Sequence, residues 1–367
     1  MRLPLAIAGE APLAHVDEYG YLHFDGGWRI EWWVGGDDHW HVPAAASSRR
    51  QRVVDNTPVV ETVIRVPGGD VAWRAAAAAS SEGGAVAIEF HTGATIPVAV
   101  GVALIAPDDI EQPQTRPSIH FTAPARSVAS EMGVELLVHP VSHTSVWRCS
   151  IGPTGPDALP PLDAVVRGWQ ALARQGASIE TGDDGLDEAL AVARASLLVH
   201  AGRLRAIPRR ALSEVDRAQG AAVASALTML GYEDEAEALR VASRLRPRRR
   251  GLPLVTEIAP HLDDSPFAML VDPSVAAATA AAVRAQLVDD SQRRVVDVLP
   301  VADASWRGRS VDISNLPTNA GPVSYALRWH GEVPALLWEA PPKVKLRASS
   351  LDAAWSSTSA RGEELVR

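Results

Sequence analysis

The stretch "RIEWWVGGDDHWH" (Arg29–His41) holds three tryptophans, two histidines and three carboxylates within thirteen residues. Polar and apolar side chains alternate in its first half, which is typical of a β-strand with one buried face. Three apolar side chains share one side of that strand and are expected in a core: Ile30, Trp32 and Val34. Glu31 and Trp33 take the other side, so we expect them to be the freer pair.

The residues on both sides of this stretch continue the β pattern. From residue 19 to about residue 151, short β-type runs are separated by Gly, Pro and Asp/Asn. Residues that tolerate a positive φ mark tight turns at Asp55-Asn56, Gly68-Gly69 and Ser81–Gly84. Nine candidate strands at hairpin spacing predict an N-terminal antiparallel β-sandwich over residues 1–152.

The period changes to helical after a Gly/Pro-rich linker at residues 153–162. Ser213 is a candidate N-cap and Gly231 a candidate C′ glycine, and Gly185 and Gly202 flank a second candidate helix. Alternating helices and loops predict a domain of stacked α-hairpins over residues 163–292.

The β pattern returns at residues 293–348, which predicts a C-terminal β element. In its segment "SYALRWHG" the polar side chains Arg328 and His330 alternate with apolar ones, so they are candidates for a polar face. The polar tail, residues 349–367, is either a docked extension or frayed.

The composition excludes several classes of function. The net charge of −9 provides no positive field for nucleic acid or an anionic membrane. No apolar run approaches about 18 residues and the N-terminus lacks a clear leader, so we expect a cytoplasmic protein without a membrane span. The single cysteine, Cys149, is expected to be a buried thiol. No G-x-S-x-G, G-x-G-x-x-G or Walker A motif occurs, and no cofactor is expected.

The helical segment "DRAQGAAVASALTMLGYEDEAEAL" (residues 216–239) resembles the helical hairpins of the six-hairpin (α/α toroid) glycosidases, the superfamily of glucoamylases, trehalases and disaccharide phosphorylases. The order of β-sandwich, linker, helices and C-terminal β element is similar to theirs. The resemblance implies a shortened, partial α/α toroid, because about 130 residues hold five or six helices and a full ring has about twelve. A homodimer that completes the ring is a further expectation.

This resemblance implies a carbohydrate-active protein that hydrolyses a glycosidic bond with a carboxylate acid/base pair. The candidates are Glu257, in a long inter-helix segment, and Asp216, at a helix N-terminus. An ordinary connector and a favourable interaction with the helix dipole explain the same two residues without catalysis. The alternative function is a non-catalytic carbohydrate-binding or scaffold protein that kept the architecture.

The tryptophan content favours carbohydrate recognition, since eleven Trp stand against four Phe and four Tyr. Indole faces stack on sugar rings, and neighbouring charged groups bind hydroxyls. For any single Trp, core packing is the alternative explanation. The candidate carbohydrate-binding residues are Glu31, Trp33, Asp37, Asp38, His39, His261, Arg328 and His330.

A metal site is the remaining candidate at the opening stretch. His39 and His41 are two residues apart, so a strand would place both on one side and they could chelate with Asp37 or Asp38. No third His or Cys follows at a familiar zinc spacing. The sequence therefore predicts no metal.

Overall fold

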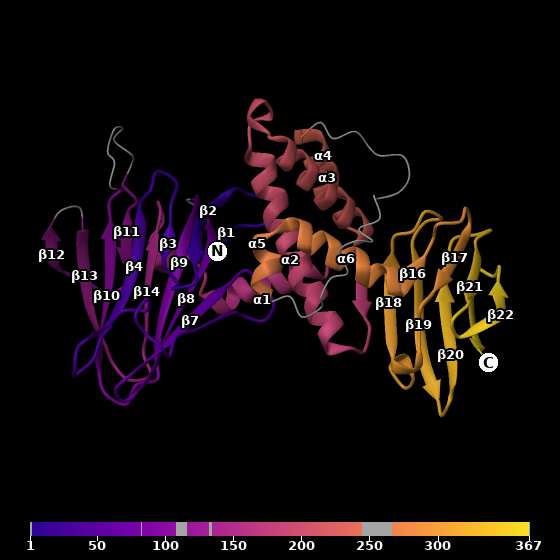
Figure 1. The fold of residues 1–367 in the computed structure, drawn as a ribbon, viewed down its shortest axis with the longest axis horizontal. Helices are drawn as coiled ribbons and strands as arrows, with labels where there is room; N and C mark the ends of the chain where they lie inside the picture. Colours follow the sequence, from indigo (N-terminus) through magenta and orange to yellow (C-terminus); the bar gives the residue numbers. More distant parts are fainter. Residues whose placement is uncertain (1, 82, 108–115, 132–133, 244–265, 367) are drawn as a thin grey trace. The chain divides into compact units, whose positions relative to one another are not determined.

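The structure is a computed structural model that describes residues 2–366 except 82, 108–115, 132–133 and 244–265. The chain forms two compact units, Met1–Trp169 and Gln170–Arg367. Antiparallel sheets make up most of the first unit, and the second contains helices followed by further sheets (Figure 1). The boundary falls inside helix α1 (Leu162–Ala173).

Two antiparallel sheets build the first unit, as the β pattern predicted. Within the described residues, sheet A has eight strands and sheet B has six. Sheet A comprises, in spatial order, β1 (Arg2–Ala6), β2 (Pro12–Asp17), β3 (Leu22–His23), β4 (Arg29–Gly35), β10 (Val98–Ile105), β13 (Val134–Val141) and β12 (Arg126–Glu131), with β5 (Trp40–His41) paired to β4. Sheet B comprises β11 (Ile119–Phe121), β14 (Val146–Ile151), β9 (Gly83–Thr92), β8 (Gly69–Ser80), β7 (Val60–Val66) and β6 (Arg50–Val53).

The inner faces of sheets A and B meet at Trp32, whose side chain is 1% exposed. Its indole stacks on Trp73 of β8 with ring centroids 6.0 Å apart, and Phe90 of β9 meets it edge-on at 6.1 Å. The indole N–H donates to the carbonyl oxygen of Tyr19 at 3.2 Å, so the polar end of the ring has a partner. Ile30 and Val34 are buried as well, which confirms the predicted inward face of β4.

Part of the outer face of sheet B is covered by the start of α1. Leu162 and Val166 pack with a set of small side chains on β8 and β9: Ala76, Ala78, Ala85 and Ala87. The small alanine side chains let the backbone of these strands lie close to α1. The short apolar face of this helix is therefore enough to exclude water from this part of the sheet. Residues 75–78, four consecutive alanines of β8, are therefore buried on both faces of the sheet.

Five further helices occupy the second unit within its described residues: α2 (Asp184–Ala206), α3 (Glu214–Met229), α4 (Glu233–Ser243), α5 (Pro266–Val271) and α6 (Pro273–Leu287). Ser213 caps α3, and Gly231 has φ +85° after it, as predicted. The predicted limits of the second helix were wrong, because α2 begins after the N-cap Asp183 and continues through Gly202. Packing explains the difference, since α2 contacts α3, α4, α5 and α6 and Gly202 is buried among them.

The described helices do not display a toroid of hairpins. Helix α2 instead lies at the centre of the helical region, with the other helices of its unit packed around it. No described helix is long and apolar enough to cross a membrane.

Two sheets complete the second unit. One comprises β15 (Ser178–Glu180), β18 (Val311–Leu316), β19 (Val323–His330), β20 (Val333–Glu339) and β23 (Arg361–Leu365), and the other β16 (Val288–Asp289), β17 (Val295–Val298), β21 (Lys345–Ala348) and β22 (Asp352–Ser357). The tail is docked, because β22 and β23 both come from it and Trp355 packs on Trp338 at 5.2 Å. Strand β15 lies in a stretch that periodicity assigned to helices, and its pairing with β18 overrides that local pattern.

Candidate functional site

The hairpin of β4 and β5 gathers most of the residues that the sequence singled out. Its turn is closed by a hydrogen bond from the Gly36 backbone N–H to the carbonyl oxygen of His39, at 3.1 Å. The register pairs Gly35 with Trp40 and Val34 with His41. Successive residues of β5 therefore serve opposite faces of sheet A.

On the outer face of sheet A, Trp33 and Trp40 form an edge-to-face pair with ring centroids 6.4 Å apart. Trp40 is 40% exposed, and its indole lies over two glycines. A Cβ atom at Gly35 would lie 3.3 Å from its Cζ3 atom, and one at Gly101 of β10 would lie 3.2 Å from the same atom. The missing side chains let the indole lie close against the sheet while one part faces solvent.

Charged and polar groups border this tryptophan pair. Glu31 lies two residues before Trp33 on the same face and forms an ion pair with Arg29 at 2.8 Å. The indole N–H of Trp33 and the Nε–H of Arg29 are buried donors without a hydrogen-bond partner among the described residues. Such donors are rare in folded proteins and commonly mark a place where water or a ligand completes the bonding.

On the turn and on the opposite face of β5, the side chains of Asp38, His39 and His41 converge. Asp38 Oδ2 lies 3.0 Å from His39 Nδ1, and Asp38 Oδ1 lies 2.9 Å from His41 Nε2. The hydrogen bond from His41, with that from the His39 backbone, lowers the pKa of the Asp38 carboxyl below its ordinary value. Asp37 is exposed in the same turn, so Glu31, Trp33, Asp37, Asp38 and His39 all belong to one hairpin.

The remaining sequence candidates lie elsewhere. Arg328 of β19 bonds to the Asp312 carboxylate at 2.6 Å and to two backbone carbonyls, which holds its guanidinium against the sheet. His330 is exposed at the end of the same strand, opposite to the buried face as predicted. Glu257 and His261 lie outside the described residues.

Asp216 has a structural role at the start of α3. Its carboxylate accepts from the Ser213 backbone N–H at 3.1 Å and from the Ser213 hydroxyl at 2.6 Å, while Ser213 Oγ accepts from the Asp216 N–H. This is a reciprocal capping box. The hydroxyl bond, together with the backbone bond, lowers the pKa of the Asp216 carboxyl, so the group is an anion rather than a proton donor.

Replacement of Asp216 by Ala is expected to lower the free energy of unfolding by about 1 kcal/mol, because the backbone N–H and the hydroxyl of Ser213 lose the carboxylate that accepts from them. Urea denaturation monitored by far-ultraviolet circular dichroism measures the change. The matched control is Asp234→Ala, which removes an acidic residue from the first turn of α4. Equal effects of the two substitutions would contradict the capping role.

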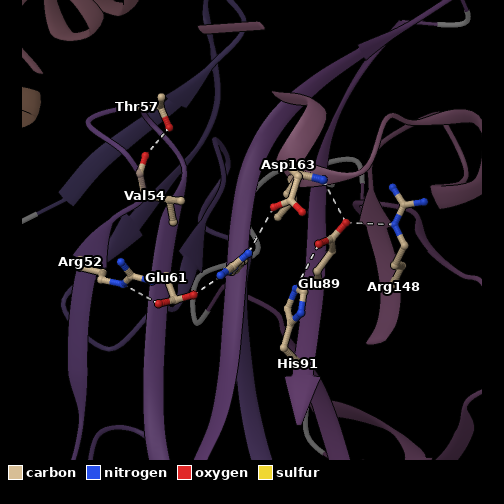
Figure 2. A network of polar contacts seen from close by, with 10 residues as sticks. Arg52, Val54, Thr57, Glu61, Glu89, His91, Arg148 and Asp163 are labelled. Carbon is tan, nitrogen blue, oxygen red and sulfur yellow. Dashed lines mark hydrogen bonds and ion pairs between the residues drawn. The ribbon is translucent and has the colours of Figure 1, made fainter. Parts of the chain in front are cut away.

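The outer face of sheet B carries an alternating charge row that the sequence did not predict (Figure 2). The register aligns five residues across five strands: Arg52, Glu61, Arg74, Glu89 and Arg148. Both glutamates are buried, at 5% and 4% exposure respectively. Glu61 receives Arg52 Nε and Arg74 Nε, each at 2.6 Å, through its two carboxylate oxygens.

Glu89 joins this row to the start of α1 (Figure 2). Its carboxylate accepts from the Leu162 backbone N–H at 3.0 Å, and it lies 3.1 Å from His91 Nε2 and 3.3 Å from Arg148 Nε. Burial alone would raise its pKa, but the hydrogen bonds from His91 and Leu162 and the nearby positive charges outweigh burial and lower it. The pKa of Glu61 is lowered in the same way, by Arg52 and Arg74 against burial.

An open hollow of about 580 Å³ lies beside this row, lined by residues of β6 to β9 that include Arg50, Arg52, Glu61 and His91. Its charged walls are paired, since Arg50 binds Asp70 at 2.7 Å and Arg52 binds Glu61. Alternation within β8 and β9 could have separated Arg74 from Trp73 and Glu89 from Phe90. The register that aligns these charges is not readable from one sequence.

Cys149 is buried, as expected, and burial raises the pKa of its thiol. Such a thiol is a poor nucleophile. No protein-family model and no curated protein matches the chain.

Proposed function

We propose that the N-terminal unit binds a carbohydrate on the outer face of sheet A. The observation that carries the proposal is the pairing of Trp33 with Trp40 on a glycine floor. A half-exposed indole presents the apolar ring face that the C–H groups of a pyranose pack against. The ion pair of Glu31 and Arg29 lies along the same strand face and supplies acceptors and donors for hydroxyl groups.

Binding, rather than hydrolysis, is the form of carbohydrate activity that the described carboxyl groups favour; Glu257 lies outside them. An acid/base pair needs one carboxyl that stays protonated near neutral pH, which requires a raised pKa. The described carboxyl groups with a shifted pKa are all lowered, among them Asp38, Glu61, Glu89 and Asp216. The order of β unit, helices and β region is also what the resemblance to the six-hairpin glycosidases implies, and this resemblance favours a carbohydrate ligand.

The test is a glycan array probed with the purified chain, followed by isothermal titration of the best ligand. Trp40→Ala is expected to weaken binding about 30-fold, because loss of an aromatic hot spot costs about 2 kcal/mol. Trp40→Phe should restore part of the affinity, since it keeps a ring at the same place.

The control is Val146→Ala, which removes an exposed apolar side chain from sheet B and should leave the affinity unchanged. Circular dichroism verifies that each variant is folded. Equal affinity of Trp40→Ala and the parent chain, or an array without a bound glycan, would exclude this face as a carbohydrate site.

A further inference from the structure

We propose that Asp38, His39 and His41 form a binding site for a divalent transition metal ion of the zinc class. One ligand atom from each side chain lies within 4.8 Å of the others. The site is distinct from the tryptophan pair, because β5 sends Trp40 to the outer face of sheet A and His41 to the other side. The inference does not rest on the proposed carbohydrate function.

The distances between donor atoms suit a small ion. Zinc is bound by imidazole nitrogen and carboxylate oxygen at about 2.0–2.2 Å, which places tetrahedral donors about 3.4 Å apart. The two oxygens of Asp38 lie 3.0 and 2.9 Å from nitrogens of His39 and His41, and the imidazole centroids are 4.1 Å apart. Small rotations of the exposed Asp38 and His39 side chains would therefore turn three mutual hydrogen-bonding groups into three ligands.

The backbone of β5 holds one of the three proposed ligands, His41, in place. His41 has a side chain only 15% exposed, and its strand is held by pairing with β4 and by Trp40 packed over Gly35 and Gly101. The ligand with least freedom is thus already in place, and Asp38 and His39 adjust to it. A pre-positioned ligand lowers the entropic cost of binding.

Gly36 provides the space that the cluster occupies. A Cβ atom there would lie 2.8 Å from Asp38 Oδ1 and 3.3 Å from His41 Nε2. The absent side chain is therefore what lets the carboxylate approach the imidazole. Because Gly36 is not itself a ligand, it offers a geometric test that leaves all donors intact.

The donor set selects the class of ion. Two imidazoles and one carboxylate suit borderline metals such as Zn²⁺, whereas Ca²⁺ and Mg²⁺ prefer shells of oxygen. Three protein ligands leave a position open to water, as in zinc sites that are not purely structural. No familiar zinc spacing marks this cluster in the sequence, because its third ligand is an aspartate immediately before the first histidine.

The test is isothermal titration of the untagged, chelator-treated full chain with Zn²⁺, and with Ca²⁺ as the negative control. One Zn²⁺ is expected to bind at this cluster and Ca²⁺ is expected not to bind. His39→Gln is the decisive variant, because its side chain is 65% exposed and its loss leaves the core untouched. Its affinity should fall more than about 100-fold, beyond the loss usual for a group that only supports a ligand.

Two further variants sharpen the result. Gly36→Ala should weaken binding with every donor present. His23→Gln is the matched control, because His23 pairs with Asp17 at 2.8 Å but belongs to no cluster of three ligand groups among the described residues, and it should keep the parent affinity. Zinc affinity that is unchanged in His39→Gln, lost equally in His23→Gln, or absent in the parent chain would overturn the proposal.

Discussion

Substitution of Trp32 by Ala is expected to lower the free energy of unfolding of the first unit by about 3–5 kcal/mol, the usual cost of truncating a buried Trp. The side chain is 1% exposed and joins the two sheets through Trp73 and Phe90. Truncation removes this bridge and opens a cavity that sheets paired on both sides cannot easily close. It also leaves the Tyr19 carbonyl without the indole N–H.

The neighbouring Trp33 provides the matched comparison. It is the same residue type on the same strand but lies on the outer face of the sheet. Trp33→Ala should therefore lower the free energy of unfolding by about 1 kcal/mol or less. Urea denaturation followed by circular dichroism measures both variants in the full chain, with the transition of the first unit fitted separately. If both variants lost the same free energy of unfolding, the prediction that only one face of β4 is buried in the core would be wrong.

The contrast between these two tryptophans also explains what the sequence could predict. Alternation in "RIEWWVGG" separates Trp32 from Trp33 because side chains of a strand have a period of two. The turn at Asp55-Asn56 was equally readable, since both residues have positive φ in the structure. The N-cap of α3 was predicted at Ser213, whereas the reciprocal bond from Asp216 that completes the capping box was not.

Features that depend on register and tertiary packing could not be predicted from the sequence. The charge row across sheet B needs five strands aligned to the residue, and the pattern of each strand says nothing about its neighbours. Gly202 failed as a helix end because contacts with other helices stabilise α2 beyond it. At the β4–β5 hairpin the sequence named the residues, but only the turn geometry brings Asp38 between His39 and His41.

The second large effect is expected at Glu89. Glu89→Gln should lower the free energy of unfolding by about 2–3 kcal/mol at neutral pH, because Arg148 and His91 lose a buried anion. This loss is smaller than the about 3–5 kcal/mol usual when one partner of a buried pair is removed, because Arg148 and His91 remain partly hydrated at 22% and 32% exposure. The amide oxygen of Gln can still accept from the Leu162 N–H, so the start of α1 stays attached.

The stabilisation by Glu89 is expected to depend on pH in a defined direction. Glu89 has a folded pKa below its ordinary value of 4.5, so its contribution is fully present above about pH 4.5 and is lost as the pH falls through the lower, folded pKa. The difference between the parent chain and Glu89→Gln should therefore shrink from about pH 7 to about pH 3. Glu61→Gln should behave alike, because its pKa is lowered by Arg52 and Arg74.

The control is Asp70→Asn on the same sheet. Asp70 pairs with Arg50 at 2.7 Å, but their side chains are 40% and 69% exposed, and exposed pairs contribute about 0–1 kcal/mol. Denaturation midpoints at both pH values measure all four proteins. If Asp70→Asn costs as much as Glu89→Gln, or if the Glu89 difference persists in acid, then the carboxylate of Glu89 does not stabilise the sheet as an anion. Burial distinguishes the two carboxylates, because water screens the exposed Asp70–Arg50 pair and is excluded from the carboxylate of Glu89.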